Sequence, residues 1–82
     1  MPLSELASSL RCAGLNSVLR NIAKGRVLKV FLAQDADEKL SSKVKDASLK
    51  QAIPVEMAAD SQQLGRACAL PRKTAVAAVL KE

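Results

Sequence analysis

The stretch GLNSVLRNIAKGRVLKVFLA, residues 14–33, gives the strongest indication of the fold. In its first half, apolar side chains recur at helical spacing, at Leu15, Val18, Leu19, Ile22 and Ala23. Gly25 follows as a residue that readily adopts the left-handed conformation common just after helices. Residues 27–33 are apolar except for Lys29, which is typical of a central strand buried on both faces. The stretch therefore predicts a helix followed by a central strand, as in an α/β fold.

Further helices and strands are predicted on both sides of this stretch. Helices are predicted over residues 3–11 and from 61 to about 69, and strands over residues 53–57 and 74–80. Residues 12–14 are predicted to form a short strand or an extended link. Asp35, Asp37 and Glu38 are predicted to open another helix, which Pro54 ends. Because proline lacks an N–H group, the strand that contains Pro54 is predicted to lie nearer an edge of the sheet.

The order of these elements predicts the architecture. Asp60 and Gln63 form a capping box before the last predicted helix. Strands separated by helices require a sheet with helices on both faces, so we expect a three-layer α/β/α sandwich with a mixed four-stranded sheet. With 82 residues and no linker or repeat, residues 1–82 are predicted to form a single domain.

Positive charge is concentrated in two parts of the chain. The net charge is +5, and residues 6–34 carry +5, residues 35–60 carry −2 and residues 61–82 carry +3. Such a distribution favours a polyanionic partner that contacts both basic parts. Phe31 is the only aromatic residue, which argues against single-strand binders that stack bases on aromatic side chains.

The chain lacks the chemical groups that several classes of function require. The chain has no histidine, and Cys12 and Cys68 have no zinc-type spacing, so we expect free cysteines, no metal site and no cofactor. Without histidine or tyrosine, and with the acids of residues 35–38 assigned to a helix start, the chain is predicted not to be an enzyme. Neither a signal peptide nor a membrane-spanning run is evident, which predicts a cytoplasmic protein.

The start of the helix after Gly14 is a candidate binding surface. Polar side chains are predicted on the stripe opposite the apolar one, at Ser17, Arg20, Asn21 and Lys24. The first-turn N–H groups and the positive end of the helix dipole attract phosphate or base acceptors, and Arg20 can bind a guanine edge with two hydrogen bonds. From this pattern alone, a nucleic-acid contact and an ordinary capped helix with a solvated basic face remain alternatives.

Five short motifs follow one another in a specific order. They are Gly14 with Asn16 and Arg20, then KG at 24–25, QDAD at 34–37, IPV at 53–55 and LGRACA at 64–69. This order resembles the L7Ae and L30e superfamily of kink-turn RNA-binding ribosomal proteins. In length the chain is similar to its short bacterial L7Ae-like members. The resemblance extends from about Leu10 to Leu80.

The resemblance implies a partner and a mode of binding. The partner is a structured RNA with a kink-turn, in ribosomal RNA, a riboswitch or another RNA, and a monomeric protein stabilises the kinked form. Relatives place the start of the corresponding helix against tandem sheared G·A pairs beside a bulge, while a loop before the last strand covers the bulged nucleotides. The RNA-binding residues implied in this chain are Gly14, Asn16, Ser17, Arg20 and Lys24, with Leu70, Pro71, Arg72 and Lys73 in the loop.

Two other classes of binding protein are weighed against RNA recognition. A protein-interaction module on the same fold is the main alternative, since Asp37, Glu38 and Asp60 could form an acidic face. DNA binding fits the positive charge, but the sequence contains no helix-turn-helix or other duplex-binding motif. RNA binding is therefore the predicted function.

Overall fold

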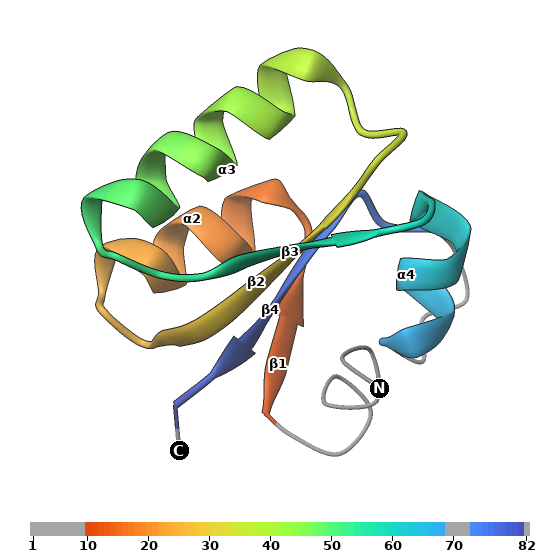
Figure 1. The fold of residues 1–82 in the computed structure, drawn as a ribbon. Coiled ribbons are helices and arrows are strands. Elements are labelled where there is room, and N and C mark those ends of the chain that lie inside the picture. The colour runs from red at the N-terminus through yellow and green to blue at the C-terminus, as the bar shows by residue number, and fades with distance from the viewer. Residues whose placement is uncertain (1–9, 69–72, 82) are drawn as a thin grey trace.

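The computed structural model describes residues 10–68 and 73–81 (Figure 1). In chain order the elements are β1 (Arg11–Ala13), α2 (Leu15–Ala23), β2 (Val27–Ala33), α3 (Glu38–Lys50), β3 (Val55–Ala58), α4 (Ser61–Ala67) and β4 (Val76–Leu80). Most of the helix predicted over residues 3–11 lies outside the described residues. Its predicted end is wrong, because Leu10 is not helical and Arg11 begins β1.

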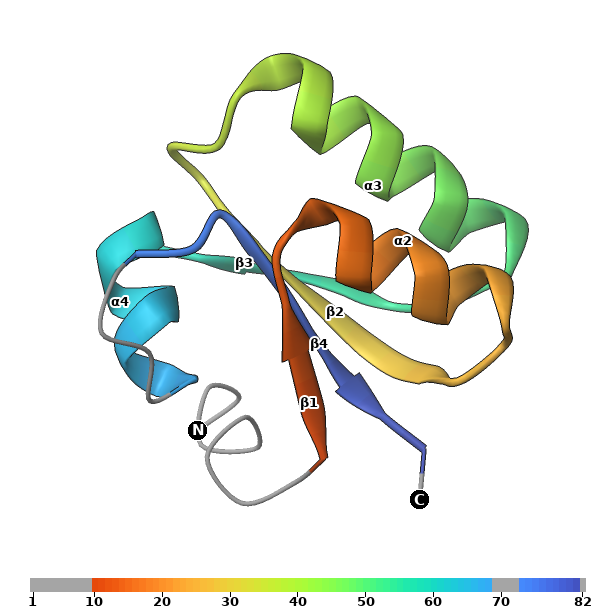
Figure 2. The same ribbon diagram turned by 180° about the vertical axis from the view of Figure 1, so that it is seen from behind.

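The strands of the described residues form one mixed sheet in the order β1-β4-β2-β3 (Figures 1 and 2). β2 and β3 are parallel, whereas β4 is antiparallel to both of its neighbours, β1 and β2. The edge position of β3 confirms the interpretation of Pro54. Along the β2 and β4 pair the register shifts between Val27 and Lys29, and Leu28 at this irregularity is 53% exposed.

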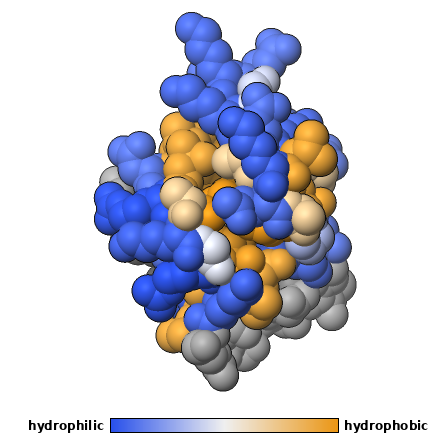
Figure 3. All heavy atoms as spheres, turned by 90° about the vertical axis from the view of Figure 1, so that its left-hand side faces the viewer, coloured by the Kyte–Doolittle hydropathy of each residue, from blue (hydrophilic) through white to orange (hydrophobic). Residues whose placement is uncertain are grey.

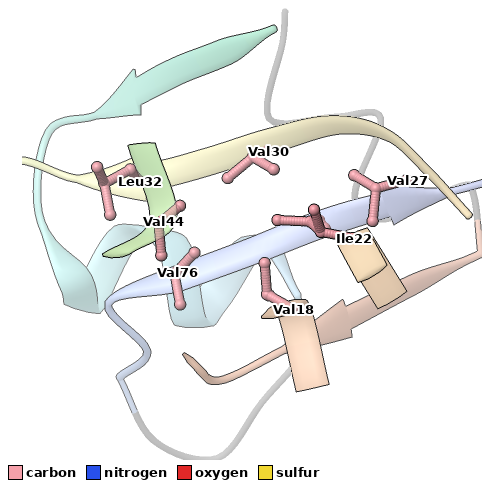
Figure 4. Close-up of a cluster of buried hydrophobic side chains, with 8 residues drawn as sticks. Val18, Ile22, Val27, Val30, Leu32, Val44 and Val76 are labelled. Carbon is pink, nitrogen blue, oxygen red and sulfur yellow. The ribbon is translucent and has the colours of Figure 1, made fainter. Parts of the chain in front are cut away.

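The helices cover both faces of the sheet, which confirms the three-layer prediction. On the face covered by α2 and α3, the buried residues are Val18, Ile22, Val27, Val30, Leu32, Val44, Val76 and Ala78, most of them labelled in Figure 4. On the α4 face they are Phe31, Ala33, Ala58, Leu64, Cys68, Ala77 and Val79. Val30 and Leu32 alternate with Phe31 and Ala33 because successive strand residues point to opposite faces. β2 is therefore a strand buried on both faces.

Most helix boundaries follow the predicted signals. Gly25 adopts a positive φ of 69° just after α2, and Asp37 Oδ1 accepts a hydrogen bond from Lys39 N–H at the start of α3 (3.0 Å). Asp60 Oδ1 accepts one from Gln63 N–H at the start of α4 (2.7 Å). α3 ends earlier than predicted from Pro54, since Ala52 already has a φ of 55°.

The predicted start of the last strand is two residues too early. Thr74 N–H donates to the carbonyl oxygen of Ser61 (3.1 Å) instead of to a neighbouring strand. Its hydroxyl group donates to the carbonyl oxygen of Val76 (3.0 Å). β4 therefore begins at Val76, and Thr74 before it is attached to the start of α4.

Candidate nucleic-acid interface

The first turn of α2 presents backbone N–H groups without a side-chain cap. Gly14, the N-cap residue, has no side chain to accept from them, and the first turn contains no acid. The N–H group of Gly14 donates to the carbonyl oxygen of Val76 (3.0 Å), so the helix start is fixed to the beginning of β4. Because first-turn N–H groups have no partners within a helix, this helix end can bind an anion or a base acceptor.

The predicted polar stripe of α2 is only partly exposed. Asn16 and Arg20 are exposed and lie four residues apart, on one side of the helix. Ser17 is half-buried, and its carbonyl oxygen accepts a hydrogen bond from Asn21 Nδ2 (2.8 Å). Asn21 is itself half-buried, so this part of the predicted stripe is only partly accessible. Lys24 is exposed, but at ten residues from Gly14 it lies about 15 Å further along the helix.

Two of the five cations between residues 6 and 34 are engaged elsewhere in the fold. Arg11 Nε donates to the carbonyl oxygen of Cys68 at the end of α4 (3.1 Å). Lys29 Nζ lies 3.8 Å from Glu56 Oε2, on the side of the sheet that faces α4. Of the two cations within or directly after α2, Arg20 is nearer to Gly14 in the chain than Lys24, so it is the better placed of these two for a ligand at the helix start.

The start of α2 and the residues before β4 border the same open hollow. Its volume is about 590 Å³, and it is lined by Ala13, Gly14, Leu15, Leu40, Lys73, Thr74, Ala75 and Val76. Residues from the two basic parts of the chain, Gly14 and Lys73, thus lie at one site. Leu70, Pro71 and Arg72, the other implied loop residues, lie outside the described residues. Leu40 also borders the hollow from α3, which sequence reasoning missed.

Asp35 braces this part of the molecule instead of opening α3. Its Oδ1 atom accepts hydrogen bonds from the N–H group (2.9 Å) and the hydroxyl group (2.6 Å) of Ser61. Ser61 in turn accepts from Thr74 N–H through its carbonyl oxygen. The chain of bonds links the end of β2 to α4 and to the residues beside Lys73. The helix-start assignment of Asp35 was wrong because its partner lies 26 residues away and no local pattern indicates it.

This brace predicts a pH dependence of stability. The hydroxyl group of Ser61 is the main cause that lowers the pKa of Asp35 below its ordinary value of 3.8, and Lys73 contributes. A carboxylate whose pKa is lowered in the folded state stabilises the fold at pH values above its ordinary pKa. This stabilisation is lost as the pH falls through the folded-state pKa. We expect Asp35→Ala to lower the melting temperature at neutral pH, with a difference from wild type that shrinks below pH 3.8.

Thermal denaturation between about pH 7 and about pH 3 measures this difference. Ser61→Ala is the matched variant, because it removes the hydroxyl bond but keeps the N–H bond to Asp35. It is expected to show a smaller difference of the same sign. A difference that stays constant over the whole pH range would contradict the assigned role of the Asp35 carboxylate.

The two cysteines were predicted to be free. Cys12 and Cys68 are indeed free in the structure, and burial raises the pKa of both thiols. Among residues 10–68 and 73–81, no group of three or more Cys, Asp and Glu side chains could hold a metal ion. The same residues contain no helix long and apolar enough to cross a membrane.

Comparisons with known proteins agree with the observed fold. The chain is 29% identical over 68 residues, 83% of each chain, to an RNA-binding protein of Geobacillus sp. (strain WCH70). It resembles the solved structure of a Bacillus halodurans protein of unknown function, with a TM-score of 0.83 and 29% identity, covering 94% of this chain and 81% of the other. It also resembles the Giardia lamblia 15.5kD RNA binding protein, with a TM-score of 0.85 and 25% identity, covering 98% and 69%.

The Geobacillus and Giardia proteins are both named as RNA-binding proteins, which agrees with the prediction of a binding protein and not an enzyme. Residues 7–82 match the sequence profile of one protein family. This match spans nearly the whole chain and agrees with the order of motifs found in the sequence. The protein therefore belongs to the ribosomal protein L7Ae/L30e/S12e/Gadd45 family.

Proposed function

We propose that this protein binds RNA in the cytoplasm as a monomer and that its target is a kink-turn, whose kinked form it stabilises. The observation that carries the proposal is the uncapped start of α2, which shares one hollow with Lys73. Membership of a ribosomal protein family and the names of two relatives support RNA as the ligand. The target is a structured RNA, in the ribosome or elsewhere.

The geometry of α2 favours a distorted RNA over a plain duplex. The major groove of an A-form helix is deep and too narrow for side chains to read its bases. A kink with non-standard pairs and a bulge opens this groove. The N–H groups after Gly14, the side chains of Asn16 and Ser17, and the guanidinium group of Arg20 then contact phosphates and base edges.

The residues before β4 are proposed to bind the bulged nucleotides. Lys73 is exposed beside the start of α2 and, with Arg72, supplies positive charge for phosphates. Leu70 and Pro71 supply apolar surface for a splayed base. Lys24, which lies at the far end of α2, contacts the RNA backbone further from the kink.

The structure gives two acids of the suggested acidic face another role, which weakens the case for a protein partner. Asp37 and Asp60 each accept a backbone hydrogen bond at the start of a helix. Their placement is thus explained by helix capping. We therefore favour RNA over a protein as the partner of this fold.

Fluorescence transfer between the two ends of a labelled RNA tests the proposal. A ligand that prefers one conformer shifts the population toward it in proportion to its differential affinity. Addition of protein is expected to raise the transfer of a kink-turn RNA, with saturation at one protein per RNA. The same duplex without its bulge is the control and should show weaker binding and no rise. Unchanged transfer at saturating protein would contradict kink-turn recognition.

A further inference from the structure

We propose that three lysines of α3, Lys39, Lys43 and Lys50, form a second RNA contact that binds the phosphates of the stem next to the kink. This α3 lysine row is separate from the start of α2, and the inference rests on the proposed function. It extends the interface from one helix to two.

Helices α2 and α3 lie side by side and begin at the same end of the sheet (Figures 1 and 2). Near their starts, Leu40 of α3 borders the hollow that also contains Gly14 and Leu15. Further along, an open groove of about 470 Å³ runs between the helices, lined by Leu19, Ile22, Ala23, Lys43, Asp46, Ala47, Lys50 and Gln51. An RNA held at the start of α2 therefore has a continuous path along α3.

The spacing of the lysines places them on the side of α3 that faces α2. Lys43 and Lys50 are seven residues apart and both line the groove, and Lys39 precedes Lys43 by four residues. All three are exposed. Arg20, also exposed, lies on α2 one residue from Leu19 in the groove wall. The groove lining therefore contains two lysines of α3 and one acid, Asp46, whereas Arg20 of α2 is not among its lining residues.

Apart from Asp46, the acids of residues 35–60 do not line this groove. Asp35 and Asp37 are bonded to backbone N–H groups near the starts of α4 and α3. Glu56 lies beside Lys29 on the α4 side of the sheet. The net charge of −2 over residues 35–60 therefore does not reveal the positive surface that the three lysines form on α3. The arrangement in space thus separates Lys43 and Lys50 from most acids of this stretch, but not from Asp46.

Positive charge and continuity with the start of α2 favour an RNA stem as the ligand of the α3 lysine row. Figure 3, which views the side of the molecule on the left of Figure 1, shows apolar side chains framed by hydrophilic ones. Lysine stems cover apolar surface while their ammonium groups reach into solvent, so the row can meet phosphates above an apolar floor. An RNA stem that leaves the kink meets this row without any change in the protein.

The test compares two kink-turn RNAs, one with a stem long enough to pass along α3 and one with that stem cut short. The variant is the double substitution Lys43→Ala with Lys50→Ala. The matched control is Lys45→Ala, because Lys45 is exposed on the same helix but does not line the groove. Circular dichroism checks that each variant folds, and affinity is measured over a range of salt concentrations.

With the long stem, the double variant is expected to bind about tenfold more weakly, and the dependence of log K on log salt to fall by about two units. With the short stem it should bind like wild type, and Lys45→Ala should change neither RNA. Equal losses of affinity for the long-stem and short-stem RNAs would overturn the proposal. No loss of affinity for either RNA would also overturn it and would favour another ligand for the groove, such as an acidic protein segment. Failure of the proposed function would give a different result: the wild-type protein would bind the bulged RNA and the plain duplex with equal affinity.

Discussion

Gly14→Ala is expected to weaken kink-turn binding strongly, whereas Gly25→Ala should leave it unchanged once both variants are folded. Gly14 has φ 90° and ψ 149°, a region open almost only to glycine, and a non-glycine residue there costs about 1–3 kcal/mol. No heavy atom lies within 4 Å of a Cβ built at either glycine, so strain rather than a clash is the cause. Relief of this strain rotates the peptide groups at the start of α2.

To bind RNA, the variant must return these peptide groups to the wild-type geometry, which restores the same strain. RNA affinity is therefore expected to fall by about 5- to 150-fold for Gly14→Ala. Gly25, with φ 69°, is the matched control: alanine there costs about 1–2 kcal/mol of stability, but at the opposite end of α2. Urea denaturation measures stability, and an RNA titration well below both melting temperatures measures affinity. Equal affinities of the two variants would show that the start of α2 does not contact the RNA.

Arg20→Ala is expected to cost about 1–3 kcal/mol of selectivity for the kink-turn over the unbulged duplex, since a guanidinium group aimed at base edges carries discrimination of that size. Arg26→Ala is the control, because Arg26 is exposed but lies in the turn after α2. Lys29 would be a poor control, since its ammonium group lies close to the carboxylate of Glu56.

Paired titrations of both RNAs with wild type and each variant measure the selectivity. For Arg26→Ala, any loss should be equal for the kink-turn and the duplex, as expected for a charge that acts at a distance. If Arg20→Ala also weakens both RNAs equally, the guanidinium group contacts phosphate and the assignment to base edges is wrong.

The parts of the fold that depend on local patterns were predictable from sequence. The apolar stripe around Val18 and Ile22, the left-handed Gly25 and the run in β2 are all set by residues close in sequence. Pro54 likewise indicated an edge strand without any knowledge of its neighbours. Each signal acts within one or two turns or one strand, where spacing and backbone chemistry determine structure.

The features that sequence reasoning missed join residues far apart. Asp35 looked like a helix-start residue, yet its partner is Ser61, 26 residues further along the chain. Charge and family resemblance indicated that Gly14 and Lys73 converge on one ligand, and the structure places both at one hollow. That Leu40 joins them depends on how α2 and α3 pack, which no local pattern specifies.

The central position of β4 has a consequence for how the protein is made. Of the three strand pairings in the described sheet, only that of β2 with β3 can form before β4 has been synthesised. Until then β1 has no neighbour, and Gly14 N–H lacks its acceptor on Val76. Sheets completed by distant segments form late and cooperatively. A growing chain therefore cannot complete the interface at the start of α2 until β4 has been synthesised.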